Sequence, residues 1–273
     1  MLQEAPLTSN RFFLALERGR RLFVKIGLWD LGLMAFAFFL YYLVRGTVEE
    51  RVTQAHSTAV RIIELEQNLG LFWETQMQDW VISSRFWIEL FNNIYVYAHF
   101  PAVVAIGVWL FFWHRRRYVL FRNAFLISGA IGLLIFNLLP TAPPRLLPSF
   151  YGFEDTMGAF SAVNYDLQPA AFVNQYAAMP SLHFGWNMLL GIAIWRTSHN
   201  PLLRAFAVLM PVAMSLSVIV TANHFILDVF AGAVVGLIGL SIALIIQRHG
   251  WKLWAWLIAR RRPNSSQTMS AGI

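Results

Sequence analysis

Long apolar segments restrict the possible folds of this chain more than any other feature. A chain of 273 residues with 58% hydrophobic and 13% charged side chains cannot bury all of its apolar surface in a water-soluble core. In hydrocarbon the backbone must satisfy its own hydrogen bonds, and a helix needs about 20 residues to cross. Six segments have the composition of spanning helices: 26–44, 94–113, 119–139, 182–195, 202–220 and 225–247.

These segments predict an all-α polytopic membrane protein, a bundle of six transmembrane helices. We expect one membrane domain over residues 1–273, with the functional motifs in 137–247 and a cytoplasmic tail at 263–273. The first span lacks a small-residue cleavage site and is expected to remain as an anchor. Apolar residues at three- and four-residue steps from Val52 to Leu69 predict an outer amphipathic helix that ends at Gly70. Packing on the bundle is its favoured role, and gating of lipid access is the alternative.

The distribution of Lys and Arg orients the predicted bundle. Cytoplasmic loops accumulate these residues, and most of the 21 lie before the first span or after the second, fourth and sixth. Both termini are therefore expected in the cytoplasm of a multi-pass cell-membrane protein. The net charge of +7 then indicates contact with anionic lipid, and no nucleic-acid partner is expected. The absence of cysteine excludes disulfides and thiolate catalysis.

Two motifs with histidine fall where predicted spans begin on the outer side. The segment 178–185 reads A-M-P-S-L-H-F-G, and we expect Ser181 to cap the helix or donate to a phosphate oxygen beside His183. The segment 221–228 reads T-A-N-H-F-I-L-D. There His224 and Asp228 are four residues apart and are expected on one face of a helix, so the carboxylate can orient one ring nitrogen and leave the other free to attack.

A third segment brings a cation to the same level. Arg145 follows the third span on the outer side, at the start of a long loop rich in Pro and Gly. One cation, two imidazoles and a carboxylate suit phosphoryl transfer. Arg145 and Ser181 are expected to hold phosphate oxygens, with Asn223 and Asn187 as further candidates.

No metal or cofactor is expected in this site. An iron centre of His183, His224 and Asp228 is the alternative, and Arg145 beside a bound cation would be unfavourable.

The P-S-L-H and H-x-x-x-D motifs resemble those of the type 2 phosphatidic acid phosphatase superfamily over roughly the last half of the chain. The resemblance implies that His224 is a nucleophile that forms a phosphohistidine. It also implies that His183 protonates the leaving group and that Asp228 orients His224.

Two cationic residues of the superfamily pattern are absent from this chain. Leu138 stands where the first motif has lysine, Leu146 replaces the proline after Arg145, and Val218 follows Ser217 where the third motif has arginine. This pattern, with the segment I-E-L-E-Q-N-L-G at 63–70, is similar to the inositol phosphorylceramide synthase branch. A site with fewer cations suits a monoanionic phosphodiester, which favours head-group transfer over dephosphorylation.

The expected function is that of an integral membrane lipid phosphatase or phosphotransferase at the outer face. Its partners are a membrane lipid phosphate substrate, an alcohol or water acceptor, and the lipid bilayer. The alternative is a non-catalytic lipid-phosphate carrier or scramblase. Asp30 in the first span serves an ion path or, as we favour, is paired or hydrated. His99 in the second binds substrate or, as we favour, makes a structural polar contact.

Overall fold

A computed structural model describes residues 27–37, 39–40, 42–43, 51–160 and 175–260 of the chain. They belong to two compact units, Met1–Gly46 and Thr47–Ile273. The first unit contains an apolar helix, Gly27–Ala37, which lies in the predicted first span and carries Asp30. The predicted cytoplasmic tail at 263–273 lies outside the described residues. A single membrane domain stays a prediction.

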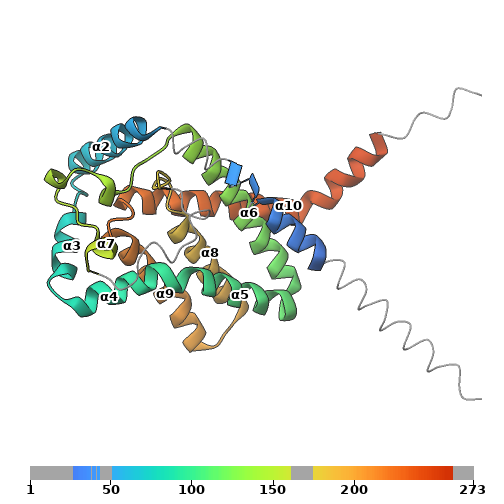
Figure 1. The fold of residues 1–273 in the computed structure, drawn as a ribbon. Coiled ribbons are helices and arrows are strands. Elements are labelled where there is room, and N and C mark those ends of the chain that lie inside the picture. Colours follow the sequence, from blue (N-terminus) through green and yellow to red (C-terminus); the bar gives the residue numbers. More distant parts are fainter. Residues whose placement is uncertain (1–26, 38, 41, 44–50, 161–174, 261–273) are drawn as a thin grey trace, which may run out of the picture. The chain divides into compact units, whose positions relative to one another are not determined.

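The described part of the second unit is helical, with one isolated bridge and no β-strand (Figure 1). In chain order its elements are α2 (Val52–Leu69), α3 (Glu74–Ile82), α4 (Arg85–Asn93), η1 (Ile94–Ala98), α5 (His99–Trp113), α6 (Arg115–Leu138), η2 (Pro144–Leu146), η3 (Ser149–Tyr151), α7 (Thr156–Phe160), α8 (Leu182–Thr197), α9 (Pro201–Val220) and α10 (Ile226–Arg260).

Four described helices are long and apolar enough to cross a membrane. They are Arg85–Trp113, which joins α4, η1 and α5, then α6, α9 and the segment Ile226–His249 of α10. They coincide with the predicted second, third, fifth and sixth spans. The predicted fourth span corresponds to α8, which has 16 residues. The protein is therefore an all-α membrane-embedded protein, and the count of six spans stays a prediction.

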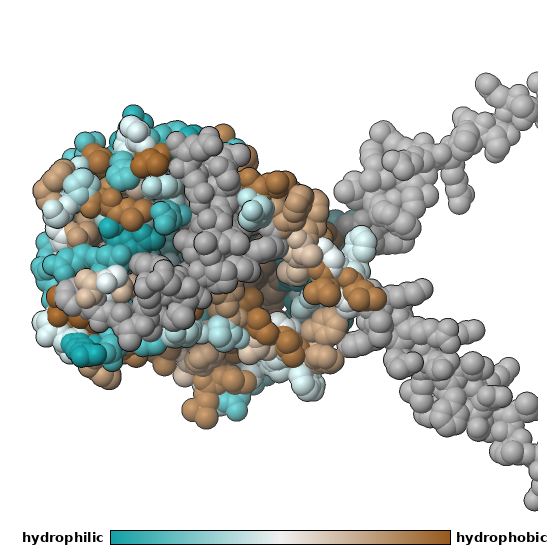
Figure 2. Space-filling model, viewed as in Figure 1, coloured by the Kyte–Doolittle hydropathy of each residue, from teal (hydrophilic) through white to brown (hydrophobic). Residues whose placement is uncertain are grey.

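Large apolar side chains remain exposed along the long helices, as expected for surfaces that face lipid. Figure 2 shows hydrophilic residues gathered over the end of the second unit that carries α2 and α3, and hydrophobic residues towards the long helices. The exposed apolar side chains on α5, α9 and α10 include Val104, Val108, Phe112, Leu209, Val212, Phe230, Val234 and Ile238.

The helices α8 and α10 cross through glycine contacts directly beneath the start of α8. A Cβ on Gly232 would overlap the carbonyl oxygen of Ser181, and a Cβ on Gly185 would overlap that of Gly232. Small residues permit such close helix approach, which is a common way to pack helices in membranes. The crossing therefore fixes the position of the first turn of α8 relative to α10.

Replacing Gly232 with alanine is expected to force the two helices apart. We expect a loss of about 1–3 kcal/mol, the usual cost of overpacking, measured as a lower midpoint of thermal unfolding in detergent by circular dichroism. Gly107 on α5 is the matched control, because a Cβ there meets no atom within 4 Å. Equal midpoints for Gly232→Ala and Gly107→Ala would show that the crossing is not tight.

A cap, defined as α2, α3 and the loop 140–160, covers the end of the bundle where α9 ends and α10 begins. The helix α2 ends at Gly70, in the left-handed conformation with φ 67°, as the sequence predicted. Buried Gln78 of α3 donates to the carbonyl oxygens of Glu154 and Val220, at 2.8 and 3.0 Å. The cap is thus joined to the loop and to the end of α9. The location of α2 on a membrane surface stays a prediction.

Candidate active site

Ser181 begins α8 as its N-cap residue, as predicted. Its hydroxyl oxygen accepts from the Phe184 amide at 3.4 Å, and its own amide donates to the Asp228 carbonyl oxygen at 2.9 Å. The side chain is fully buried. Ser181 therefore ties the first turn of α8, which carries half-buried His183, to the first turn of α10.

The turn between α9 and α10 carries His224. Ala222 has a φ of 54°, a left-handed conformation that costs a non-glycine residue about 1–2 kcal/mol. The amides of Asn223 and His224 both donate to the Val218 carbonyl oxygen, at 3.1 and 2.9 Å. These contacts hold the strained turn, as is often found where a functional side chain must be aimed.

The ring of His224 is fixed through its Nδ1 atom, which lies 2.7 Å from the carbonyl oxygen of Ala178. Because a carbonyl oxygen only accepts, Nδ1 must carry the proton, and in the neutral ring Nε2 then holds the lone pair. The side chain is buried, with 6% of its surface exposed. Within the described part of the chain no hydrogen-bond partner of Nε2 is found, so this nitrogen can meet a substrate.

Asp228 takes a different position from the one predicted. We expected His224 and Asp228 on one helix face, but α10 begins at Ile226 and His224 precedes it. The Asp228 Oδ2 atom accepts from the Phe225 amide at 2.9 Å and lies 3.4 Å from His224 Nδ1. The carboxylate therefore caps α10 and adds a negative charge beside the ring, while the Ala178 carbonyl makes the shorter contact.

Arg145 reaches this turn from the cap loop. Its amide donates to the Ala222 carbonyl oxygen at 2.9 Å, and its Nε donates to Asn223 Oδ1 at 3.0 Å. The Asn223 amide nitrogen in turn donates to the Thr221 hydroxyl at 2.9 Å. Asn223 thus holds Arg145 beside His224, and a direct contact of Asn223 with phosphate stays a prediction.

The two motif histidines lie opposite one another. The ring centroids of His183 and His224 are 5.9 Å apart, with the ring planes inclined by 58°. Arg145, Ser181, His183, His224 and Asp228 therefore come together around the starts of α8 and α10. The predicted spans placed these residues at one end of the bundle, and the structure brings them together there. The membrane face at which this end lies stays a prediction.

Two further rings border His183, one from η1 and one from the first residue of α5. Tyr95 and His99 lie 5.0 and 4.9 Å from the His183 ring, measured between centroids. The π-helical turn η1 precedes Pro101, which has no amide proton for regular helix bonding. π-turns occur frequently at functional sites.

His99 makes the polar contact that the sequence favoured for it. Its Nδ1 lies 2.7 Å from the Asn187 amide nitrogen, which also donates to the His183 carbonyl oxygen at 2.8 Å. Asn187 is fully buried and is engaged beneath His183. Sequence reasoning missed Tyr95, whose only signal was its place one turn before His99.

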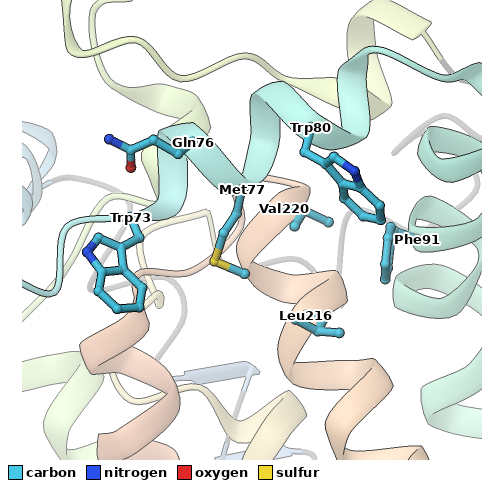
Figure 3. A pocket seen from close by; sticks show the side chains of 7 residues that line it. All are labelled: Trp73, Gln76, Met77, Trp80, Phe91, Leu216 and Val220. Atoms are coloured by element: carbon cyan, nitrogen blue, oxygen red, sulfur yellow. The ribbon is translucent and has the colours of Figure 1, made fainter.

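A separate pocket of about 600 Å³ opens between α3, α4 and α9, and neither motif histidine is among its lining residues (Figure 3). Figure 3 shows Met77 between the indole rings of Trp73 and Trp80. Its lining carries no titratable side chain. The lining residues are Trp73, Gln76, Met77, Trp80, Phe91, Leu216 and Val220.

Comparison with known proteins adds one family and one relative. The sequence matches the family model of the PAP2 superfamily over residues 60–242, more than half of the chain. A protein of Bacteroides thetaiotaomicron named phosphoinositol dihydroceramide synthase is 26% identical over 189 residues. The match covers 64% of this chain and 58% of that protein, so the chain spans little more than half of the relative's length. No solved structure matches the chain.

Proposed function

Because this chain belongs to the PAP2 superfamily, we propose that it transfers a phosphate-linked head group from a membrane lipid to an acceptor alcohol through His224. His224 Nε2 attacks phosphorus, and the bond from phosphorus to the lipid oxygen breaks. His183 gives that oxygen its proton. The acceptor alcohol then loses its proton to His183 and attacks phosphorus, which releases His224.

The observation that carries this proposal is the pairing of the two rings. At 5.9 Å between centroids they are too far apart to bond each other and are spaced to contact one phosphoryl group from two sides. The Ala178 carbonyl leaves the lone pair of His224 on Nε2, the nitrogen that can attack. Asp228 stabilises the positive charge that the ring gains during transfer.

The cation content of the site supports a phosphodiester as substrate. Arg145 and the amides at the start of α8 are the groups that we assign to the phosphate oxygens, with Ser181 as a further donor. Val218 stands at one of the two positions that have a cation in the superfamily pattern, and its side chain is fully buried in an apolar cluster with Met214 and Ile219. One phosphate charge matches this site better than two.

The name of the Bacteroides relative favours inositol phosphate as the head group. The test is to incubate the purified protein in detergent with an inositol phospholipid and dihydroceramide and to analyse the products by mass spectrometry. Phosphoinositol dihydroceramide supports head-group transfer, and free inositol phosphate without it supports hydrolysis. If neither forms with any of a broad panel of lipids, the enzyme proposal fails and a carrier or scramblase remains.

The site is proposed to lie at the outer face, with both termini in the cytoplasm. The native chain has no cysteine, so single cysteines report sidedness cleanly. In intact cells an impermeant maleimide is expected to label Ser149→Cys, in the cap, without permeabilisation. Ser198→Cys, between α8 and α9, is expected to react only after permeabilisation. The reverse pattern would place the site in the cytoplasm.

Activity is expected to be independent of divalent metal ions, because a histidine nucleophile needs no metal to generate it. Turnover measured with and without excess EDTA should agree within error. Loss of turnover that one added divalent ion restores would favour the iron-type alternative at His183, His224 and Asp228. Among the described residues no group of three His, Cys, Asp or Glu side chains is arranged to hold a metal.

A further inference from the structure

Three consecutive amides directly after His224 are each bonded by a different carboxylate. The Phe225 amide donates to Asp228 at 2.9 Å, the Ile226 amide to Glu74 at 3.0 Å, and the Leu227 amide to Glu66 at 2.7 Å. The free amides at a helix N-terminus are usually bonded by the side chain of a residue nearby in sequence. Here two of the three carboxylates belong to α3 and α2, 152 and 161 residues away from the amides that they bond.

The two cap carboxyls are buried together. Glu66 of α2 is 0% exposed and Glu74 of α3 is 1% exposed, and their Oε1 atoms accept from the consecutive amides of Leu227 and Ile226, so the two carboxyl groups lie side by side. The Oε2 atom of each is buried without a hydrogen-bond partner among the described residues. Two ionised carboxyl groups at one buried site repel each other, and a proton on one of them removes that repulsion. Asp228, also fully buried, adds a third acidic group to this cluster.

The surroundings of Glu66 favour its protonated form. Burial raises the pKa of Glu66 to about 9, and the contact with Glu74 acts in the same direction. The Leu227 amide acts in the opposite direction, and the charges of Glu74 and Asp228 raise the pKa further. The other titratable group beside Asp228 is His224 itself. At neutral pH the Glu66 carboxyl is therefore protonated.

We propose that Glu66 and Glu74 act as a protonated carboxyl pair that positions His224 for attack. This inference rests on the proposed function and assigns a role to two residues outside the histidine motifs. By holding the Ile226 and Leu227 amides, the pair fixes the chain that carries the imidazole. Because the pair holds a proton, it places one negative charge near the anionic phosphate, where two ionised carboxyl groups would place two. The two residues act on the reaction only through the backbone that holds His224.

Activity as a function of pH separates positioning from a plain structural role. Glu66→Gln keeps an acceptor for the Leu227 amide and a donor for Glu74, so kcat at pH 7 is expected to stay within about 3-fold of wild type. Above pH 9 wild type is expected to lose activity as the pair ionises, while Glu66→Gln retains it. Glu66→Ala is expected to lose about 10²-fold in kcat at every pH with KM little changed, the cost of a misplaced reacting group.

Unfolding of the protein in detergent tests the proton on Glu66 without any activity. A carboxyl whose pKa is raised on folding stabilises the protein at low pH, and this stabilisation is lost as pH rises through the folded pKa, here about 9. The unfolding midpoint of wild type should therefore fall relative to Glu66→Gln between pH 5 and pH 10. Glu64→Gln, an exposed neighbour on α2, should follow wild type.

Each outcome decides one point. If Glu66→Gln and wild type show the same change of midpoint with pH, the proton on Glu66 is refuted, whether or not the protein is an enzyme. If folded Glu66→Ala keeps wild-type kcat, positioning is refuted. If Glu66→Ala does not fold, Glu66→Gln decides through its alkaline activity. If wild type turns over no lipid, the proposed function and the catalytic role fall together, and the unfolding data still decide the proton.

Discussion

His224→Asn is expected to lower kcat by about 10⁴- to 10⁶-fold, the range found when a member of a nucleophile–base pair is removed from an enzyme. An asparagine amide can still donate to the Ala178 carbonyl oxygen that fixes the native ring. The variant thus loses the nucleophilic Nε2 while it keeps the contact that holds the turn. The measurement is product formation from the lipid pair, followed by mass spectrometry.

The control is His199→Ala, an exposed histidine in the connection between α8 and α9. It should turn over like wild type, and both variants should elute as folded protein with an unchanged unfolding midpoint. Activity of folded His224→Asn within 10-fold of wild type would show that His224 does not bond to phosphorus.

His183→Ala is expected to lower kcat by about 10²- to 10⁴-fold, the usual contribution of a general acid. The size of the loss depends on the leaving group. A lipid alkoxide needs a proton to depart, whereas a nitrophenolate does not. The variant should therefore recover most of its activity with a nitrophenyl phosphodiester, measured as the rate of nitrophenolate release.

Recovery with the activated ester must be absent in His224→Asn, because that variant lacks the attacking atom. Equal losses of His183→Ala with alkoxide and nitrophenolate leaving groups would assign His183 to binding and not to proton transfer.

The sequence predicted the parts of the fold that rest on local pattern. Apolar length located the four long helices, and the three- and four-residue spacing of α2 with Gly70 located that helix to within one residue. The two histidine motifs identified the superfamily, which the family match confirms. The helix that contains the predicted second span begins at Arg85, about nine residues before the apolar segment, because amphipathic α4 continues into α5 through η1.

The features that escaped prediction depend on contacts between distant segments. The Ala178 carbonyl that sets the tautomer of His224 is a backbone group, which leaves no mark in a sequence. The left-handed conformation of Ala222 could not be predicted either, because the residues that usually indicate such a turn are glycine and asparagine. Glu66 was visible as one acidic residue within an apolar stripe, but its partner Glu74 lies on another helix, and only the fold brings the two to α10.

The most direct test of the central claim is to trap the covalent intermediate. Wild-type protein is mixed with an inositol phospholipid without acceptor, quenched within the first turnover at neutral to alkaline pH, digested, and analysed by mass spectrometry. We expect a peptide that carries the phosphate-linked head group on His224, formed by wild type, absent in His224→Asn, and lost from wild type when dihydroceramide is added before the quench. Transfer to dihydroceramide with no such adduct at His224, or with the head group on another residue, would contradict it.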